Sequence, residues 1–386
     1  CYKMRKVEDR MKKLLSLALC AVLLHMNAAA LPAMGELTAK SAALYDASGQ
    51  MLYEMNAEEP LQPASVTKIM TLLLAMEALD RGEVQLDTMV TGSAHAASMG
   101  GTQIWLKEGE QLSFDEMLKA IAVGSANDCA VAVAEHLCGS EEAFVQKMNE
   151  RAKELGCTST TFVNANGLDA DGQKTLTSAR DLALISAELL RHPKILDYTT
   201  IWMDTIRNGE FSLANTNKML RSYNGLVGLK TGYISEAGFC ISAVAERDGM
   251  TLIATVMGAP TKEDRTADAT ALLDYGFANF APYTPDLSAA LTPLRVRMGQ
   301  KETVTLEAGE VQPVVVAKEE ATTETHLPDA VDAPIEAGQE LGSVTVKSGD
   351  KTLLTIPLAA AEAVDRLRFG DVYQSFLRAA LMKQAG

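Results

Sequence analysis

The sequence lacks an excess of positive charge. It has 35 Lys and Arg residues against 50 Asp and Glu residues, which gives a formal net charge of −15 at pH 7. Residues 1–30 contain more basic than acidic side chains, so the rest of the chain is more acidic still. A nucleic-acid-binding surface needs a basic patch to neutralise phosphates, and this composition therefore argues against that class of function.

Metal-binding patterns are also absent from the sequence. No two of its six cysteines form a C-x-x-C pair, and no histidine lies at ligand spacing from those beyond the N-terminal segment. We therefore expect no zinc site and no metal cofactor. The four cysteines beyond that segment are Cys129, Cys138, Cys157 and Cys240. The first two fall in an apolar helical pattern, which favours buried free thiols, although the sequence leaves a disulfide bond open.

The apolar run at the N-terminus, Leu14–Leu24, is too short to cross a membrane comfortably. It follows the basic Met11-Lys12-Lys13 and precedes Ala28-Ala29-Ala30, which has the A-x-A pattern of a cleavage site. We interpret residues 1–30 as a signal peptide, with residues 1–10 upstream of the true start. The mature protein is therefore expected to be exported.

The length of 386 residues and the hydrophobic content of 47% are sufficient for two or three domains with buried cores. Residues 40–55 predict a hairpin, and a capping box at Ser113 and Glu116 predicts one of the helix starts. The expected helices cover residues 65–79, 113–123, 128–137, 140–155, 178–191 and 262–280. Strand patterns return after Gly225. Strands, then helices, then strands indicate an α+β domain with a helical insert between the halves of a sheet.

Composition changes near Pro282, where prolines mark a linker. We therefore place a first, catalytic domain at residues 36–283. Residues 284–357 are rich in Val and Thr and predict a small all-β domain, with a tight turn at Ser348-Gly349-Asp350. Residues 358–386 show apolar side chains at a spacing of three to four and predict an amphipathic helix. Such a helix either packs on its own domain or attaches peripherally to a membrane.

Three short motifs carry the chemistry that the sequence suggests. They are S-x-x-K at residues 65–68, S-x-N at residues 125–127 and K-T-G at residues 230–232, at intervals of about 60 and 105 residues. Alone, the first usually marks a surface helix start, the second usually caps a helix, and the third is as often a turn. All three in this order favour the functional interpretation.

Ser65 and Lys68 are suited to be a nucleophile and its base. At the start of a helix, positions i and i+3 share a face, so the hydroxyl and the amine can touch. A lysine acts as a base only when it is neutral, and burial or a second cation, such as Lys230, lowers its pKa. The five histidines offer no competing base, because the sequence has no G-x-S-x-G motif and no defensible Ser-His-Asp arrangement.

The second motif has residue types suited to proton transfer. The hydroxyl of Ser125 can bridge Ser65, Lys68 and the substrate, and can relay a proton to a leaving amine. The side-chain amide of Asn127 can donate to a substrate carbonyl while its oxygen accepts from Lys68.

The third motif has residue types suited to binding an anionic substrate. Lys230 and Thr231 offer a cation and a hydroxyl to a terminal carboxylate. Gly232 leaves room for a ligand backbone to approach. The backbone N–H groups of Ser65 and Tyr233 are candidates for an oxyanion hole.

Residues 38–283 resemble the serine-type D-alanyl-D-alanine carboxypeptidases, which are the low-molecular-weight penicillin-binding proteins. Beyond the three motifs, the similarity lies in residues 124–128 (GSAND), 162–168 (FVNANGL) and 228–232 (GLKTG). Residues 284–357 resemble the β-rich C-terminal domain of that family, and the tail resembles its membrane-anchoring end. The resemblance implies the penicillin-binding/β-lactamase-like fold, with an antiparallel sheet and a cluster of helices.

The resemblance also implies a reaction. Ser65 would attack the bond between the last two D-alanines of a peptidoglycan stem peptide, with Lys68 as base, Ser125 as proton relay and Lys230 as carboxylate anchor. D-alanine would leave, and water would hydrolyse the acyl-enzyme. The reaction would take place at the outer face of the cytoplasmic membrane or in the cell wall. β-Lactam antibiotics would acylate the same serine, and no metal or cofactor is implied.

Three alternatives share these motifs. A class A β-lactamase would need a deacylating Glu between the second and third motifs, but residues 160–176 contain none. An endopeptidase or transpeptidase on the same fold remains open. A non-catalytic wall-binding protein is disfavoured because Ser65, Lys68, Ser125 and Lys230 are all present.

Overall fold

The computed structural model describes residues 34–169, 172–318 and 321–373. The chain forms two compact units, which divide between residues 282 and 283. The expected signal peptide and most of the expected C-terminal helix lie outside the described residues.

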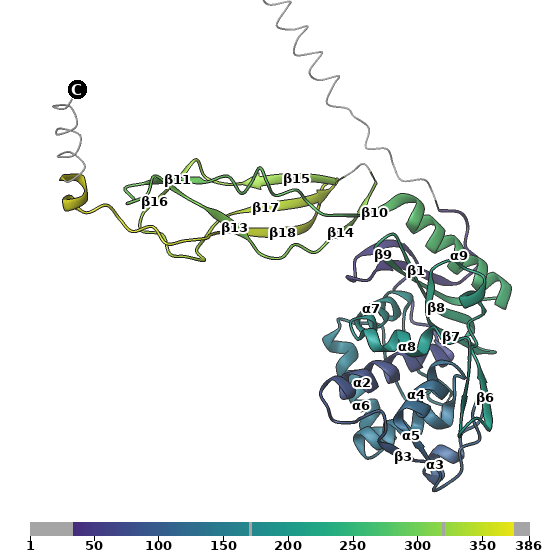
Figure 1. Ribbon diagram of the computed structural model, residues 1–386. Coiled ribbons are helices and arrows are strands. Elements are labelled where there is room, and N and C mark those ends of the chain that lie inside the picture. Colours follow the sequence, from purple (N-terminus) through teal and green to yellow (C-terminus); the bar gives the residue numbers. More distant parts are fainter. Residues whose placement is uncertain (1–33, 170–171, 319–320, 374–386) are drawn as a thin grey trace, which may run out of the picture. The chain divides into compact units, whose positions relative to one another are not determined.

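A five-stranded antiparallel sheet forms the centre of the first unit (Figure 1). Its strands lie in the order β2-β1-β9-β8-β7, so β7 is an edge strand. The strands are β1 (Ser41–Asp46), β2 (Met51–Met55), β7 (Leu226–Ile234), β8 (Gly238–Arg247) and β9 (Met250–Ala259). Nearly every residue of β9 is buried, which is typical of a strand covered on both faces of its sheet.

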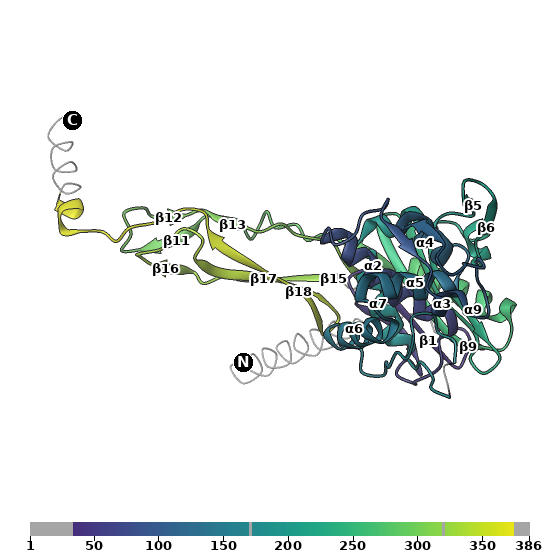
Figure 2. The same cartoon turned by 90° about the horizontal axis from the view of Figure 1, so that it is seen from below.

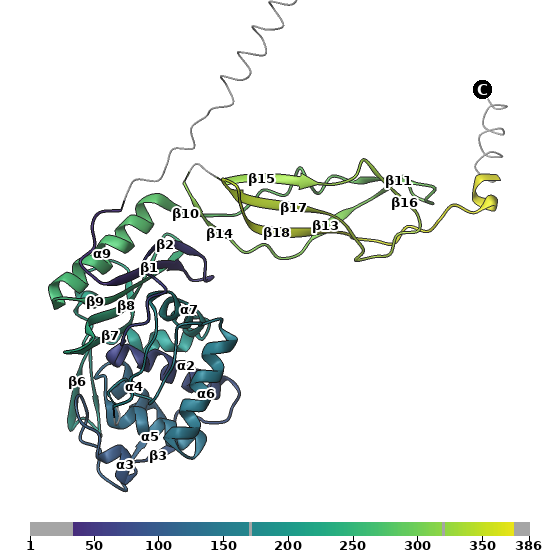
Figure 3. The same cartoon turned by 180° about the vertical axis from the view of Figure 1, so that it is seen from behind.

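Helices cover both faces of this sheet (Figures 1 and 3). On one face, α9 (Lys262–Asn279) approaches so closely that a Cβ at Gly276 would lie 2.4 Å from Leu252. On the other face, α7 (Ala179–Leu190) places Ser186 Oγ 2.8 Å from Ser242 Oγ. The other long helices are α2 (Lys68–Asp80), α4 (Phe114–Ala122), α5 (Asn127–Cys138) and α6 (Glu141–Glu154).

Helix α2 is the central helix of the helical group. Its sequence, KIMTLLLAMEALD, is apolar around most of its circumference, and most of its residues are buried. It is preceded by a 3₁₀ turn, η1 (Ala64–Thr67). The predicted helices of this unit are present, and the capping box of Ser113 and Glu116 begins α4 as expected. The α+β architecture predicted from the sequence is confirmed.

Several short elements were not predicted, because segments of three or four residues are too short to show a period. They include two small hairpins, in which β3 pairs with β4 and β5 pairs with β6. The short elements are β3 (Met89–Thr91), β4 (Gln111–Ser113), β5 (Met203–Ile206), β6 (Phe211–Ala214), α3 (Ala94–Ala97), α8 (Leu196–Thr199), η2 (Pro193–Ile195), η3 (Lys218–Arg221) and β10 (Phe280–Tyr283).

The second unit is built from strands (Figure 2). They form a three-stranded sheet in the order β12-β11-β16 and a four-stranded sheet in the order β13-β18-β17-β15. The strands are β11 (Leu294–Arg297), β12 (Thr303–Val304), β13 (Leu306–Ala308), β14 (Val314–Ala317), β15 (Ala321–His326), β16 (Ala330–Asp332), β17 (Glu340–Ser348) and β18 (Lys351–Ala360). The predicted turn joins β17 to β18, with Gly349 in a left-handed conformation (φ 54°).

The C-terminal helix begins later than predicted. We expected a helix from residue 358, but β18 continues to Ala360, and Val364 is buried in the same apolar core. Helical backbone begins at Phe369 in the described residues. The reason is that buried side chains alternate with a period of two at Ile356, Leu358 and Ala360, so this segment belongs to a strand.

Two further expectations concern cysteines and membrane association. Within the described residues, Cys129, Cys138, Cys157 and Cys240 are free thiols. None of the helices described there combines the length and the apolar character needed to cross a membrane.

Candidate active site

Ser65 lies in the turn that begins the central helix. Pro63 precedes this turn, and Ala64 adopts a left-handed backbone conformation (φ 49°). Lys68 follows one turn later as the first residue of α2, and its Nζ lies 3.0 Å from Ser65 Oγ. The structure therefore brings the expected nucleophile and base into hydrogen-bond contact.

Lys68 has two further hydrogen-bond partners, and both are fixed acceptors. Its Nζ donates to Asn127 Oδ1 at 2.6 Å and to the backbone carbonyl of Asn166 at 2.8 Å. A neutral amine has two N–H groups and one lone pair. When both N–H groups donate to these acceptors, the lone pair is left for the hydroxyl of Ser65. This arrangement orients the amine to take a proton from Ser65.

The environment of Lys68 favours the neutral amine. Burial holds the pKa of Lys68 well below its ordinary value, and the positive charge of Lys230 lowers this pKa further. The buried carboxylate of Asp128 acts in the opposite direction. A lowered pKa increases the fraction of amine that can accept a proton, as a general base requires.

Ser125 and Asn127 occupy the short connection between α4 and α5. Ser125 adopts a left-handed conformation (φ 62°), is buried, and lines the same pocket as Ser65. Within the described residues it is not a hydrogen-bond partner of Lys68, whereas Asn127 is. The amide nitrogen of Asn127 donates to Gly100 at 2.8 Å, which leaves one of its two N–H groups for a ligand.

Strand β7 carries the third motif along one wall of the pocket. Burial, together with the charge of Arg265, lowers the pKa of Lys230 to about 7. The Nζ of Lys230 donates to the carbonyl of Thr231 at 3.0 Å, and the hydroxyl of Thr231 donates to Thr216 at 2.8 Å. Tyr233 is exposed and stacks on a neighbouring ring of the sheet.

Gly232 has a packing role in addition to the ligand contact that we expected. We expected it to make room for a ligand backbone, but a Cβ at this position would lie 2.5 Å from the carbonyl oxygen of Pro63 and 2.9 Å from Val66. The missing side chain therefore lets β7 pack against η1, the turn that holds Ser65. Gly232 does line the pocket, so its backbone is still accessible to a ligand.

The loop that supplies the carbonyl of Asn166 is held firmly from several sides. Asn164 Oδ1 accepts from the backbone N–H of Gly167 at 2.7 Å, and Glu141 Oε1 accepts from that of Ala165 at 2.9 Å. Gly167 packs so tightly that a Cβ would lie 2.0 Å from the carbonyl oxygen of Ala64. Sequence reasoning missed Asn166 because a backbone carbonyl carries no residue-type signal, although similarity to the family did include this segment.

Arg265 is a second residue that sequence reasoning missed. It lies near the start of α9 and lines the pocket with Lys262. The side chain is buried, and its Nε has no hydrogen-bond partner among the described residues. An unpaired buried donor beside a pocket is satisfied when an anionic ligand enters. The only sequence feature that could have indicated Arg265 was its spacing of three positions from another basic residue, Lys262, on a predicted helix.

The pocket has a volume of about 260 Å³ and lies between the three motifs and α9. Its lining residues are Ser65, Thr102, Ser125, Thr216, Thr231, Gly232, Tyr233, Phe239, Lys262 and Arg265. A serine activated by a buried lysine lies in the same pocket as a group of cations. This arrangement is suited to acyl transfer from a substrate that ends in a carboxylate.

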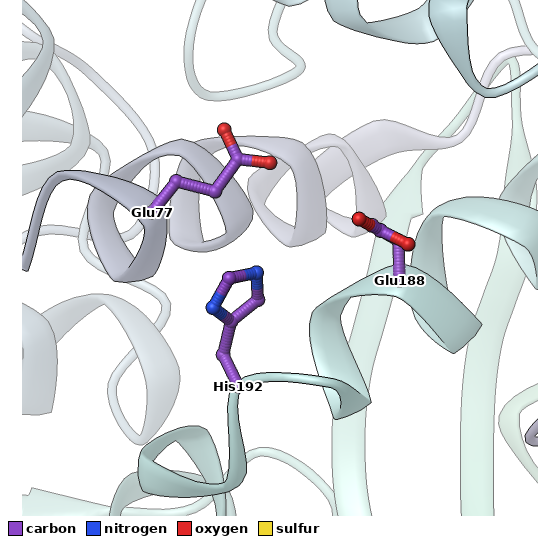
Figure 4. A group of neighbouring side chains, drawn as sticks. All are labelled: Glu77, Glu188 and His192. Carbon is purple, nitrogen blue, oxygen red and sulfur yellow. The ribbon is translucent and has the colours of Figure 1, made fainter. Parts of the chain in front are cut away.

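A cluster of potential metal ligands lies away from the pocket, at the later part of α2. Glu77, Glu188 and His192 place ligand atoms within 4.8 Å of one another (Figure 4). However, Arg151 Nε lies 2.7 Å from Glu77, and its Nη2 lies 2.5 Å from Glu188. His192 Nδ1 forms a hydrogen bond with Asp80 Oδ2 at 2.5 Å. Because Arg151 already forms ion pairs with both carboxylates, we interpret this cluster as an ion-pair network that joins α2, α6 and α7.

Known proteins are similar to this chain in both sequence and fold. Residues 26–261 match the D-alanyl-D-alanine carboxypeptidase family, and residues 286–366 match the C-terminal domain of penicillin-binding protein 5. D-alanyl-D-alanine carboxypeptidase DacF of Bacillus subtilis is 41% identical over 340 residues, which cover 86% of this chain and 87% of that protein.

Two solved structures extend the comparison. Penicillin-binding protein 5 of Haemophilus influenzae has 30% identity and a TM-score of 0.75, over 86% of this chain and 99% of that one. Penicillin-binding protein D2 of Listeria monocytogenes, in its ampicillin-bound form, has 36% identity and a TM-score of 0.58, over 62% of this chain and 98% of that one. The expected fold and family resemblance are confirmed, and the chain belongs to the D-alanyl-D-alanine carboxypeptidase family.

Proposed function

We propose that the protein is a serine-type D-alanyl-D-alanine carboxypeptidase that removes the terminal D-alanine from peptidoglycan stem peptides. The observation that carries this proposal is the 3.0 Å contact between Ser65 Oγ and the buried amine of Lys68. Two fixed acceptors orient that amine toward the serine. Membership of the family, and the name of the Bacillus subtilis relative, support the choice of substrate.

In the acylation step, Ser65 Oγ attacks the carbonyl carbon of the penultimate D-alanine. The hydroxyl proton moves to Lys68 Nζ as the ester bond forms, and the peptide bond to the last D-alanine breaks. The leaving nitrogen must gain a proton, and the hydroxyl of Ser125, in the same pocket, relays it. The backbone N–H groups of Ser65 and Tyr233 stabilise the negative charge on the carbonyl oxygen.

In the deacylation step, water attacks the ester on Ser65 and the shortened peptide leaves. Lys68 takes a proton from the water, and Ser65 regains its hydroxyl hydrogen. A class A β-lactamase would use a Glu here, and the nearest candidate by contact with the 162–168 loop is Glu141. Its two oxygens are engaged by Ala165 and His95, and it does not line the pocket. This observation favours the carboxypeptidase over the β-lactamase.

The cations of the pocket bind the carboxylate of the terminal D-alanine. We expected Lys230 and Thr231 to form this site, and Arg265 joins them because its Nε is buried and unpaired in the described residues. Placing two cationic groups, Lys230 and Arg265, close together in a buried site costs free energy that an anionic ligand offsets. The same cations suit the carboxylate of β-lactam antibiotics, which we propose as covalent inhibitors that acylate Ser65.

We further propose that the protein acts outside the cytoplasm, at the cytoplasmic membrane or in the cell wall, where its substrate lies. In this proposal, residues 1–30 direct export, the catalytic domain at residues 36–283 is followed by the β-rich domain, and the C-terminal tail attaches to the membrane surface. The tail would start near Phe369, because the segment before it belongs to the β domain.

The proposal predicts that a labelled penicillin forms a stable adduct with the protein, and that peptide mass mapping places the label on Ser65. It also predicts stoichiometric release of D-alanine from a peptide that ends in D-alanyl-D-alanine. Both measurements use the full mature chain. An adduct on another residue, or a labelled Ser65 without any D-alanine release, would contradict the carboxypeptidase assignment.

The activity is also expected to rise with pH, because Lys68 accepts a proton only after it has lost its own. The charge of Lys230 lowers the pKa of Lys68. Lys230→Met removes that charge, so the pKa of Lys68 should rise and the acidic limb of the kcat/KM profile should move to higher pH. The matched control is Lys262→Met, which removes a cation that lines the pocket and is not among the causes of this pKa shift. If the acidic limb of the kcat/KM profile stayed at the same pH in Lys230→Met and only the maximum kcat/KM fell, the charge of Lys230 would not lower the pKa of Lys68.

A further inference from the structure

Trp105 is a large apolar side chain that the fold leaves in solvent. It is 66% exposed, although aromatic side chains of this size are usually more buried. Its ring meets Phe211 of β6 edge to face, with centroids 5.9 Å apart. The guanidinium of Arg207 lies over the other aromatic ring, 5.3 Å from the centroid of Phe211. We call Trp105, Phe211 and Arg207 the Trp105 platform.

The backbone around Trp105 is fixed in a strained conformation. Trp105 has a left-handed φ of 56°, which is unfavourable for a bulky residue. The N–H groups on either side, of Ile104 and Leu106, donate to the buried carboxylate of Asp128 at 3.0 and 2.9 Å. Arg207 Nη1 donates to the carbonyl of Ile104 at 2.8 Å. The strained backbone of Trp105 is held by the carboxylate of Asp128 and by the guanidinium of Arg207, and it keeps the indole ring exposed to solvent. Backbone strain that is maintained in this way indicates a binding role.

The Trp105 platform is continuous with the catalytic pocket. Thr102, three residues before Trp105, lines the pocket, so the two are at most about 10 Å apart along the chain. Thr216, which follows β6, also lines the pocket. The β5–β6 hairpin and the segment after α3 lie at the same end of the helical part of this unit (Figures 1 and 3).

We propose that the Trp105 platform binds a sugar ring of the peptidoglycan strand to which the stem peptide is attached. This inference rests on the proposed function. Four extended residues between the scissile bond and the sugar span up to about 14 Å, which exceeds the roughly 10 Å of chain between Thr102 at the pocket and Trp105, so a bound stem peptide is long enough to bring its sugar to Trp105. A sugar ring offers a face of C–H groups that packs on an indole, and its hydroxyls can bond the exposed Lys107 and Glu108 that follow on the loop.

The test compares D-alanine release from three substrates that share the same D-alanyl-D-alanine end: an acylated tripeptide, the free pentapeptide and the disaccharide-pentapeptide. In Trp105→Ala, kcat/KM should fall about tenfold for the disaccharide-pentapeptide and no more than about twofold for the other two. The matched control is Met203→Ala on β5, which removes a side chain of similar exposure, 63%, and should change none of the three.

Three outcomes would overturn the sugar platform. Equal losses on all three substrates would mean that Trp105 only supports the pocket, and a loss that is already complete with the free pentapeptide would mean that the platform contacts the peptide. An unchanged kcat/KM on all three would exclude any contact.

A binding measurement separates failure of this inference from failure of the proposed function. The chain has two tryptophans, so Trp202→Phe leaves Trp105 as the only fluorophore of its kind. Titration with disaccharide-tetrapeptide should change the Trp105 emission saturably, and tetrapeptide without sugar should not at the same concentrations. This result would support the Trp105 platform even in a protein that released no D-alanine, and its absence would overturn the platform even in an active enzyme.

Discussion

Replacing Lys68 with methionine is expected to lower kcat/KM for D-alanine release by about 10²- to 10⁴-fold, the range typical of a lost general base. Methionine has a similar length and fills the buried site, but it has no lone pair on nitrogen to accept the proton of Ser65. Labelling of Ser65 by penicillin should slow by a similar factor, because both reactions begin with the same proton transfer.

The protein should remain folded in this variant. Removing a buried amine relieves its desolvation cost, whereas the oxygens of Asn127 and Asn166 lose a donor, at about 1–3 kcal/mol each. These opposing effects predict only a modest change in thermal stability, which circular dichroism can follow. Lys153→Met, at an exposed position of α6, is the control and should leave activity unchanged. A Lys68→Met protein that keeps a tenth of the wild-type rate would show that another group is the base.

Gly167→Ala is expected to reduce both stability and activity strongly. Its Cβ would lie 2.0 Å from the carbonyl oxygen of Ala64 and 2.6 Å from Thr67 Oγ1, so the turn that holds Ser65 must move. The left-handed backbone adds about 1–2 kcal/mol and the overpacking about 1–3 kcal/mol to the loss of folding free energy. A displacement of Ser65 by about 1 Å can cost a factor of 10² in rate.

Gly156→Ala separates the two contributions to that effect. Gly156 has a similar left-handed backbone (φ 74°, against 87° at Gly167), but no atom lies within 4 Å of a Cβ built there. This control should show only the backbone cost, about 1–2 kcal/mol, and full activity. If the two variants lost equal stability and Gly167→Ala kept its activity, the packing of the 162–168 loop against η1 would not position the nucleophile.

The sequence predicted those parts of the site that depend only on residue type and on spacing along the chain. Ser65 in η1 and Lys68 at the start of α2 are three positions apart in continuous helical backbone, so their contact follows from local geometry and needs no tertiary information. Asn127 was assigned to Lys68, 59 positions away in the sequence, only because the three motifs occurred together. The capping box at Ser113 and the Val- and Thr-rich composition of the C-terminal strands were equally local signals.

The parts that escaped prediction depend on tertiary packing. The carbonyl of Asn166 could belong to any residue, and only the loop conformation brings it to Lys68. Arg265 enters the pocket because α9 packs on the sheet, which no local pattern reveals. Gly232 was predicted as a ligand contact, and its second role, making room for η1, depends on packing between distant segments. The end of the β domain was misplaced because Leu358 and Ala360 fit a helix as well as a strand until the neighbouring strand is known.

The cationic pocket has a thermodynamic consequence for substrate binding. With a pKa of about 7, Lys230 is only partly protonated at neutral pH in the free enzyme. A bound carboxylate stabilises the ammonium form, so the substrate and a proton should be taken up together near this pH. Release of D-alanine carries the carboxylate away and returns the proton to solvent. Once Lys230 has lost its proton, its charge no longer lowers the pKa of Lys68. The amine that must take a proton from water in deacylation is therefore a stronger base after the first product has left than while that product is bound.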